Sequence, residues 1–269
     1  MIKTKQVGRF RVGRLNARRE ARKLRVIINN QEKTYFRRLN ALFRKYLRTS
    51  AFLYEEFGRY EISEGAARLR EEFFPITVTH FRKVFRVIYD TNNKKFKDEL
   101  KDEIFVLDRS EDFEKLINDY FATRELFLTG VSARLAARID KVIRDGRADG
   151  LNLDQIARKV AADFGFARSR AALVARTETH SAATFANHQY YKTASDDYGL
   201  GLVKQWVATN DARTRESHRN ANGQERDMAE DFLIDGVPMN YAGDPKGGAK
   251  NVVNCRCVIV YADERDIVL

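Results

Sequence analysis

Proline is scarce in this sequence, and its scarcity leaves most of the chain free to form helices. The 269 residues include three prolines, Pro75, Pro238 and Pro245. Because proline lacks a backbone N–H and its ring clashes with the preceding turn, it interrupts helices where it occurs. We therefore expect helices along most of the chain and a loop around the last two prolines.

Cysteines and long apolar runs are also few. The two cysteines, Cys255 and Cys257, are one residue apart and do not make the framework of a small secreted protein. No apolar run approaches the ~18 residues that a membrane-spanning helix needs, and no apolar segment follows the N-terminal charges as in a secretory signal. We expect a protein of a reducing cytoplasm with no membrane span.

Acidic residues are nearly missing from residues 1–50. This segment has 16 lysines and arginines against Glu20 and Glu32, an excess of 14 positive charges. The whole chain carries +11, so the other 219 residues carry a net −3. Such a block binds polyanions or remains solvated.

We expect this basic arm to bind double-stranded DNA without sequence specificity, because clustered Lys and Arg gain affinity by releasing counterions. The alternatives are a solvated charged face and docking onto an acidic protein surface. The residues predicted to contact nucleic acid are Arg9, Arg11, Arg14, Arg18, Arg19, Arg22, Lys23, Arg25, Arg37, Arg44, Lys45 and Arg48.

Apolar residues recur at helical spacing through most of the first 200 residues. The pattern predicts an amphipathic helix that begins near Tyr35 and ends near Gly58, and a second helix over 62–74 that stops at Pro75. Further helices are expected over 79–88, 94–105, 112–127, 131–144, 153–164 and 169–195, with Thr129-Gly130 as a break and Asn152 as a cap.

The periodicity changes after Gly201. Residues 203–208 alternate as a half-buried strand does. Thr214 is expected to cap a short helix that ends at Gly223, residues 235–251 to form a loop, and residues 252–261 to form a second strand. The predicted fold is mainly α with a small C-terminal α+β domain, in which long helices are followed by a small antiparallel sheet.

The polar stretch 145–150 is the best candidate for a domain junction, because it contains two glycines and little that could be buried. We therefore divide the chain into a basic N-terminal arm with the start of the amphipathic helix (1–50), a helical region (51–148), a C-terminal domain (149–263) and a tail (264–269).

Several short motifs follow one another after residue 150, and their order is more specific than any one of them. They are Arg176-Thr177-Glu178-Thr179, Trp206-Val207-Ala208-Thr209, Asp211-Ala212-Arg213-Thr214-Arg215 with His218 and Gly223, Tyr241-Ala242-Gly243-Asp244-Pro245, and Asn254-Cys255-Arg256-Cys257. The series resembles the phage head-morphogenesis family, the Mu protein F-like minor capsid proteins, from about Leu151 to Tyr261. The first 145 residues match no motif of that family.

The resemblance implies a non-enzymatic minor capsid protein inside the head of the virion, made in the host cytoplasm and present in multiple copies per particle. Its expected partners are the portal protein, the major capsid protein and packaged DNA, and its expected role is in head assembly or genome ejection. The alternatives are a toxin-like ADP-ribosyltransferase or nuclease, and a cellular nucleic-acid-binding module. The sequence contains no HExxH, GxSxG or P-loop motif that would favour an enzyme.

His218, Cys255 and Cys257 form the candidate metal site, because two thiolates and an imidazole supply three of the four ligands of a structural zinc ion. Asp211, His180 and His188 are the candidates for the fourth ligand. In the alternative interpretation, the thiols pack beneath Trp206 and His218 bonds to a loop carbonyl. No other cofactor is expected.

The other motif residues are interpreted as fold-defining. Asp211 is expected to bond backbone N–H groups at the start of a helix, and Arg213 to clamp a carboxylate. Trp206 is expected to anchor the core of the small sheet, with an exposed interface as the alternative. The full set is Arg176, Glu178, Trp206, Asp211, Arg213 and Gly223.

Overall fold

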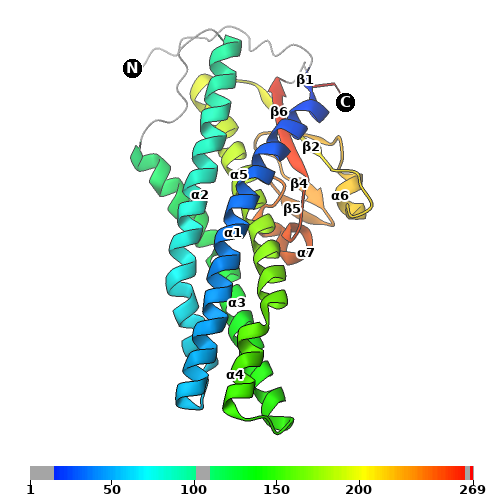
Figure 1. The fold of residues 1–269 in the computed structure, drawn as a ribbon. Helices are drawn as coiled ribbons and strands as arrows, with labels where there is room; N and C mark the ends of the chain where they lie inside the picture. The colour runs from blue at the N-terminus through cyan, green and yellow to red at the C-terminus, as the bar shows by residue number, and fades with distance from the viewer. Residues whose placement is uncertain (1–14, 101–109, 264–266, 269) are drawn as a thin grey trace. The chain divides into compact units, whose positions relative to one another are not determined.

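The structure is a computed structural model that describes residues 15–100, 110–263 and 267–268 (Figure 1). Long helices come first in the chain and a small antiparallel sheet follows, so the predicted fold class is confirmed. None of the described helices is both long and apolar enough to cross a membrane. The five long or medium helices are α1 (Ala17–Phe57), α2 (Ile62–Leu100), α3 (Ser110–Ala148), α4 (Leu153–Ala162) and α5 (Phe164–Tyr198).

The elements after α5 are short. The central sheet has the order β3-β2-β6, with both neighbours antiparallel to β2, and Trp206 on β2 pairs with Ile259 on β6. Strand β1 (Leu15–Asn16) precedes α1. The elements that follow α5 are β2 (Leu202–Val207), α6 (Glu216–Asn220), β3 (Glu225–Asp227), β4 (Phe232–Ile234), β5 (Val237–Met239), η1 (Pro245–Gly247), α7 (Gly248–Val252), β6 (Val258–Asp263) and β7 (Ile267–Val268).

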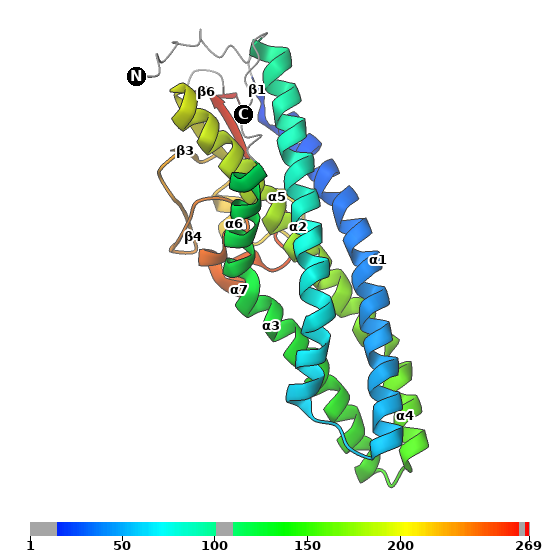
Figure 2. The same cartoon turned by 90° about the vertical axis from the view of Figure 1, so that its left-hand side faces the viewer.

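Two predicted helix breaks are wrong. Helix α2 continues through Pro75, and α3 continues through Gly130, as the unbroken ribbons in Figure 2 show. Proline in a helix costs about 3 kcal/mol and glycine about 1 kcal/mol. Phe73 and Leu128, close to the two predicted breaks, are fully buried. Packing on this scale offsets both penalties, because tertiary burial supplies most of a helix's stability in a protein.

Other boundaries agree more closely with the sequence. Helix α1 ends at Phe57, where Gly58 adopts a φ of 64° and donates its N–H to the Tyr54 carbonyl. Asn152 caps α4 through a capping box with Gln155, as predicted for Asn152. The expected loop over 235–251 instead contains β5, η1 and α7, and the last strand begins at Val258 and not at residue 252.

The described residues divide into two compact units. One, the helical unit, comprises residues 33–80 and 118–176; the other, the sheet unit, comprises the described parts of 1–32, 81–117 and 177–269. Helices α1, α2, α3 and α5 each contribute to both units. The helical unit has one apolar core, in which the Tyr35 hydroxyl bonds the Thr77 hydroxyl (2.7 Å) and Phe43 packs edge-on against Phe73.

The sheet unit is built around β2. All six residues of β2 are buried, so the predicted half-buried strand is wrong: it is covered on both faces. The side-chain nitrogens of Lys204 and Gln205 have partners inside the unit, whereas Gln205 Oε1 and Trp206 Nε1 are buried without a hydrogen bond to the described residues. Lys204 donates to the carbonyls of Met228 (3.2 Å) and Asn240 (3.1 Å), and Gln205 donates to the Glu225 carboxylate (3.0 Å). Buried polar groups are tolerated when they are bonded in this way.

Replacing Phe73 with alanine is expected to destabilise the helical unit by about 3–5 kcal/mol, because the change leaves a cavity in a fully buried site. The matched control is Phe52→Ala on α1, where the side chain is 60% exposed. Denaturant unfolding followed by circular dichroism measures both. A Phe73→Ala variant as stable as the control would show that burial of Phe73 does not offset the cost of Pro75 within α2.

Candidate functional site

The two cysteines and His218 meet in the sheet unit. Cys255 and Cys257 are buried and lie in the irregular segment just before β6, so the prediction that they lie on a strand is wrong. Their alternation nevertheless brings both thiols to one imidazole nitrogen. The Cys255 Sγ is 3.6 Å from His218 Nδ1, and the Cys257 Sγ is 3.5 Å from the same atom. The three candidate ligand atoms all lie within 4.8 Å of one another.

The two thiols titrate differently. Hydrogen bonding to Cys257, together with burial, raises the pKa of the Cys255 thiol. Contacts from Cys255 and His218 outweigh burial and lower the pKa of the Cys257 thiol. The two neighbouring thiols therefore shift each other's pKa in opposite directions.

Helix α5 holds the cysteine segment in place. Thr177 accepts the Asn254 N–H at its hydroxyl (3.3 Å), and His180 Nε2 bonds the Cys257 carbonyl (2.6 Å). Asn254 has a φ of 58°, a left-handed conformation that asparagine tolerates better than most residues. Thr177 belongs to the predicted Arg176-Thr177-Glu178-Thr179 motif, in which Glu178 is fully buried. No pattern in the sequence indicated this positioning role of Thr177 and His180.

A second attachment runs through Arg256, between the two cysteines. Its guanidinium binds the Asp211 carboxylate bidentately, at 2.5 and 2.6 Å. This ion pair holds the pKa of the Asp211 carboxyl well below its usual range. The Arg256 carbonyl accepts from the Thr209 hydroxyl (2.9 Å) and from Arg25 Nε (3.3 Å). The motif that ends at Thr209 and the motif that begins at Asp211 therefore both bond Arg256.

The turn after β2 differs in part from its prediction. Asp211 Oδ1 accepts the Arg213 backbone N–H (3.0 Å), as expected of a carboxylate before a helix. However, the guanidinium that clamps Asp211 comes from Arg256, and Arg213 itself is exposed. Thr214 does not cap α6: its hydroxyl bonds Asp211, and the cap residue is Arg215 without a side-chain bond.

Trp206 is fully buried, so its predicted core position is confirmed. Its ring packs edge-on against His218 (centroids 5.6 Å apart) and Phe232 (5.4 Å). Gly223 has a φ of 83° and donates its N–H to the Trp206 carbonyl (2.8 Å). These contacts fix the His218 ring beside the thiols; His218 bonds no loop carbonyl through Nδ1, which faces the sulfurs.

The three candidates for a fourth ligand are engaged elsewhere. Asp211 binds Arg256, His180 binds the Cys257 carbonyl, and His188 Nδ1 lies 3.1 Å from the Tyr261 hydroxyl. Within the described part of the chain, no further Cys, His or carboxylate belongs to the cluster of three.

The predicted nucleic-acid-binding residues fall into several environments. Arg9, Arg11 and Arg14 lie outside the described residues. Arg25 is half-buried and uses its guanidinium on the carbonyls of Val207 (2.9 Å) and Arg256. The exposed members on α1 are Arg18, Arg19, Arg22, Lys23, Arg37, Lys45 and Arg48.

In the helical unit, several of these cations have intramolecular partners. The guanidinium groups of Arg44 and Arg48 lie over the Phe164 ring, at 4.5 and 5.7 Å from its centroid. Lys45 forms an ion pair with Glu72 (2.8 Å). Cation–π contacts and surface ion pairs of this kind each contribute about 1 kcal/mol or less.

In the sheet unit, Arg18, Arg22 and Arg25 line one hollow with a volume of about 540 Å³. Their spacing of four and three residues places them on one side of α1. Ala17 and residues 205–210 and 222–223 form the rest of its wall. The hollow is thus a basic surface beside the end of β2.

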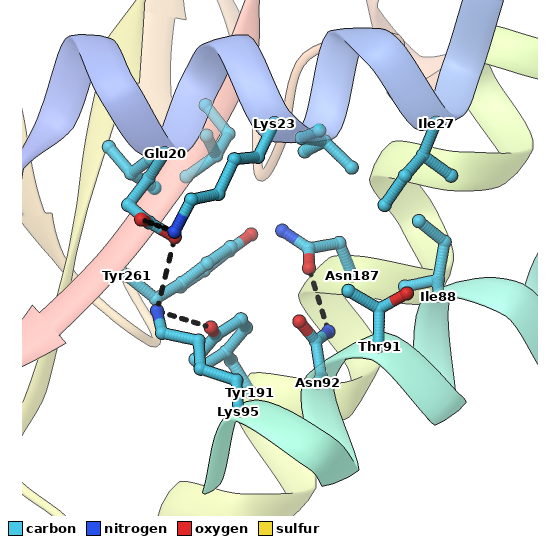
Figure 3. Close-up of a pocket in the computed structure, with 13 residues that line it drawn as sticks. Glu20, Lys23, Ile27, Ile88, Thr91, Asn92, Lys95, Asn187, Tyr191 and Tyr261 are labelled. Atoms are coloured by element: carbon cyan, nitrogen blue, oxygen red, sulfur yellow. Dashed lines mark hydrogen bonds and ion pairs between the residues drawn. The ribbon is translucent and has the colours of Figure 1, made fainter. Parts of the chain in front are cut away.

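A separate cavity of about 140 Å³ lies where α1, α2, α5 and β6 approach one another (Figure 3). Glu20 on α1 contacts Lys23 (2.7 Å) and Lys95 (3.5 Å), and Lys95 donates to the Tyr191 hydroxyl (3.3 Å). Burial raises the pKa of the Glu20 carboxyl, but Lys23 and Lys95 outweigh burial and lower it.

The opposite wall of this cavity is a pair of amides. Asn92 Nδ2 donates to Asn187 Oδ1 at 2.9 Å, which joins α2 to α5. Tyr191 stacks on Tyr261 with ring centroids 4.5 Å apart. The polar groups around the cavity thus bond one another, and together with the stacked tyrosines they join α1, α2, α5 and β6.

Comparison with known proteins shows which protein family the C-terminal part of the chain resembles. A family model described as phage Mu protein F like protein matches residues 137–260. The minor head protein GP7 of Bacillus phage SPP1 is 29% identical over 133 residues, which are 49% of this chain and 42% of that protein. The NAD(+)–arginine ADP-ribosyltransferase EFV of Enterococcus faecalis is 31% identical over 128 residues, which are 47% of this chain and 26% of that protein. No solved structure matches significantly.

These matches concern the C-terminal part of the chain. Residues 137–260 match the model of the Mu protein F-like phage head-morphogenesis family, so the resemblance predicted from the motif series is confirmed. The family region begins within α3, before the boundary near Leu151 expected from the motifs. The chain spans less than half the length of both curated relatives.

His188 is expected to make stability fall at acid pH. Burial lowers its pKa from 6.5 to about 3. The unfolded chain therefore binds a proton below pH 6.5 that the folded chain excludes until pH 3, and folding stability is lost across that interval by about 1.4 kcal/mol per pH unit. The free energy of unfolding should fall more steeply from pH 6.5 to 5 in the wild type than in His188→Gln. Equal slopes would show that His188 is not held neutral.

Proposed function

We propose that this protein is a non-enzymatic minor capsid protein that attaches to the portal or to the inner surface of the capsid shell, contacts packaged DNA, and assists head assembly or genome ejection. The observation that carries the proposal is the family region over residues 137–260, which includes the contact network around the cysteine segment. The name of the SPP1 relative, minor head protein, supports the same role.

The basic surface of α1 supports the DNA contact. Arg18 and Arg22 are exposed at the rim of the basic hollow, and they follow a segment that contributes further arginines at 9, 11 and 14. Their positive charge suits a DNA backbone that carries one phosphate per ~1.7 Å. The described part of the chain has no helix-turn-helix or zinc-finger arrangement for reading bases, so the contact is proposed to be non-specific.

The role in the head is tested in the phage that encodes the protein. Purified heads are expected to contain several copies of the chain, and deletion of its gene is expected to reduce the yield of DNA-filled, infectious particles. Quantitative mass spectrometry of purified heads measures the copy number. Absence of the chain from heads, or normal particle yield without it, would contradict the proposal.

The match to an ADP-ribosyltransferase favours a second candidate, transfer of ADP-ribose from NAD to arginine. This chain corresponds to 26% of that protein, so most of the transferase has no counterpart in the match. Purified heads and the purified chain are therefore both assayed for ADP-ribosyltransferase activity. Consumption of NAD or labelling of arginine would replace the non-enzymatic assignment.

DNA binding is expected to weaken when the basic hollow loses charge. In Arg18→Gln/Arg22→Gln, the slope of log affinity against log salt should fall by about 1 for each arginine that contacts a phosphate. The charge-matched control is Lys246→Gln/Lys250→Gln, whose lysines are exposed on η1 and α7. Fluorescence anisotropy with duplexes of unrelated sequence measures both variants. An equal loss in the two variants would assign binding to net charge alone.

A further inference from the structure

We propose that Cys255, Cys257 and His218 bind one zinc ion through their two Sγ atoms and Nδ1, with the fourth position open to a small pocket. The site would join α6 to the segment that precedes β6.

The distances from the two sulfurs to the imidazole nitrogen match those of a tetrahedral zinc site. Zinc binds thiolate sulfur at about 2.3 Å and imidazole nitrogen at about 2.0–2.1 Å, which at tetrahedral angles separates sulfur from nitrogen by roughly 3.6 Å. The two observed separations from His218 Nδ1 are 3.6 and 3.5 Å. All three ligand atoms lie within 4.8 Å of one another, so the two sulfurs and the nitrogen are close enough to share one ion.

The charge also balances. Two thiolates neutralise a divalent zinc ion, and a neutral imidazole adds no charge, so the loaded site is neutral in a buried position. Thiolate and imidazole together select zinc over the oxygen-binding cations Mg²⁺ and Ca²⁺.

The fourth position faces a void of about 10 Å³, which is the size of one water molecule. Arg213, Thr214, Arg215 and Asn254 contribute to its wall. None of these side chains is a usual zinc ligand, so we assign the position to water. The Arg215 guanidinium donates to the Val253 carbonyl (2.6 Å).

The ligands are positioned by groups outside the site. His180 and Thr177 bond the backbone on both sides of the cysteines, and the edge-on contact with Trp206 orients the His218 ring. Such supporting contacts typically change metal affinity by about 10–100-fold. We therefore expect His180→Gln to weaken zinc binding within that range while the three ligands remain.

The test measures metal in the full-length protein purified without chelators or a metal-affinity step. Elemental analysis is expected to find one zinc per chain, and cobalt substitution to give the absorption of tetrahedral cobalt thiolate. His218→Gln and Cys257→Ser should lose both signals. The matched control is His80→Gln, a buried histidine that stacks on Tyr35 in the helical unit and should retain them.

If the variants fail to fold, zinc binding is tested on the wild-type protein alone. Thiols that react with a disulfide reagent only after a strong chelator is added support the site. A wild-type chain that is folded by circular dichroism, carries no zinc, takes up none on addition, and has thiols that react equally with and without chelator would overturn the proposal.

Discussion

The sheet unit depends on how the backbone of residues 254–257 is satisfied. This segment precedes β6 and takes no part in the strand ladder, so its N–H and C=O groups need partners elsewhere. They find them in the Thr177 hydroxyl, the His180 ring, the Thr209 hydroxyl and the Arg25 guanidinium. The position of both thiols is therefore set by α5, by α1 and by the turn after β2 together.

This dependence gives the motif series a physical meaning. Its members are far apart in sequence, yet hydrogen bonds connect four of them: the motifs that contain Thr177, Thr209, Asp211 and Arg256. Each motif supplies a partner that another lacks. A chance occurrence of one motif would satisfy none of these bonds, which explains why the ordered set predicts the family while a lone CxC does not.

Sequence patterns predicted the features that are periodic or local. They failed where a contact between residues far apart in the sequence determines a helix boundary or a hydrogen-bond partner. The helical repeat and the Asn152 cap are local, and both appear in the structure. The stops at Pro75 and Gly130 were wrong because burial of residues such as Phe73 and Leu128 outweighs local propensity. Arg213 was expected to clamp a carboxylate, but the bidentate clamp at this turn comes from Arg256, which binds Asp211 from 45 residues away.

Charge counting has the same limit, because a basic residue's role depends on what lies beside it. Arg25 belongs to the block of 16 lysines and arginines, yet it bonds two carbonyls and holds the cysteine segment. Arg44 and Arg48 lie over an aromatic ring. A polyanion could displace such partners only at a free-energy cost, so the excess of 14 overstates the charge that is available on this segment. Among the described residues, Arg18 and Arg22 are exposed near the start of α1. The same helix therefore stabilises the cysteine segment with Arg25 and offers a basic surface one and two turns earlier.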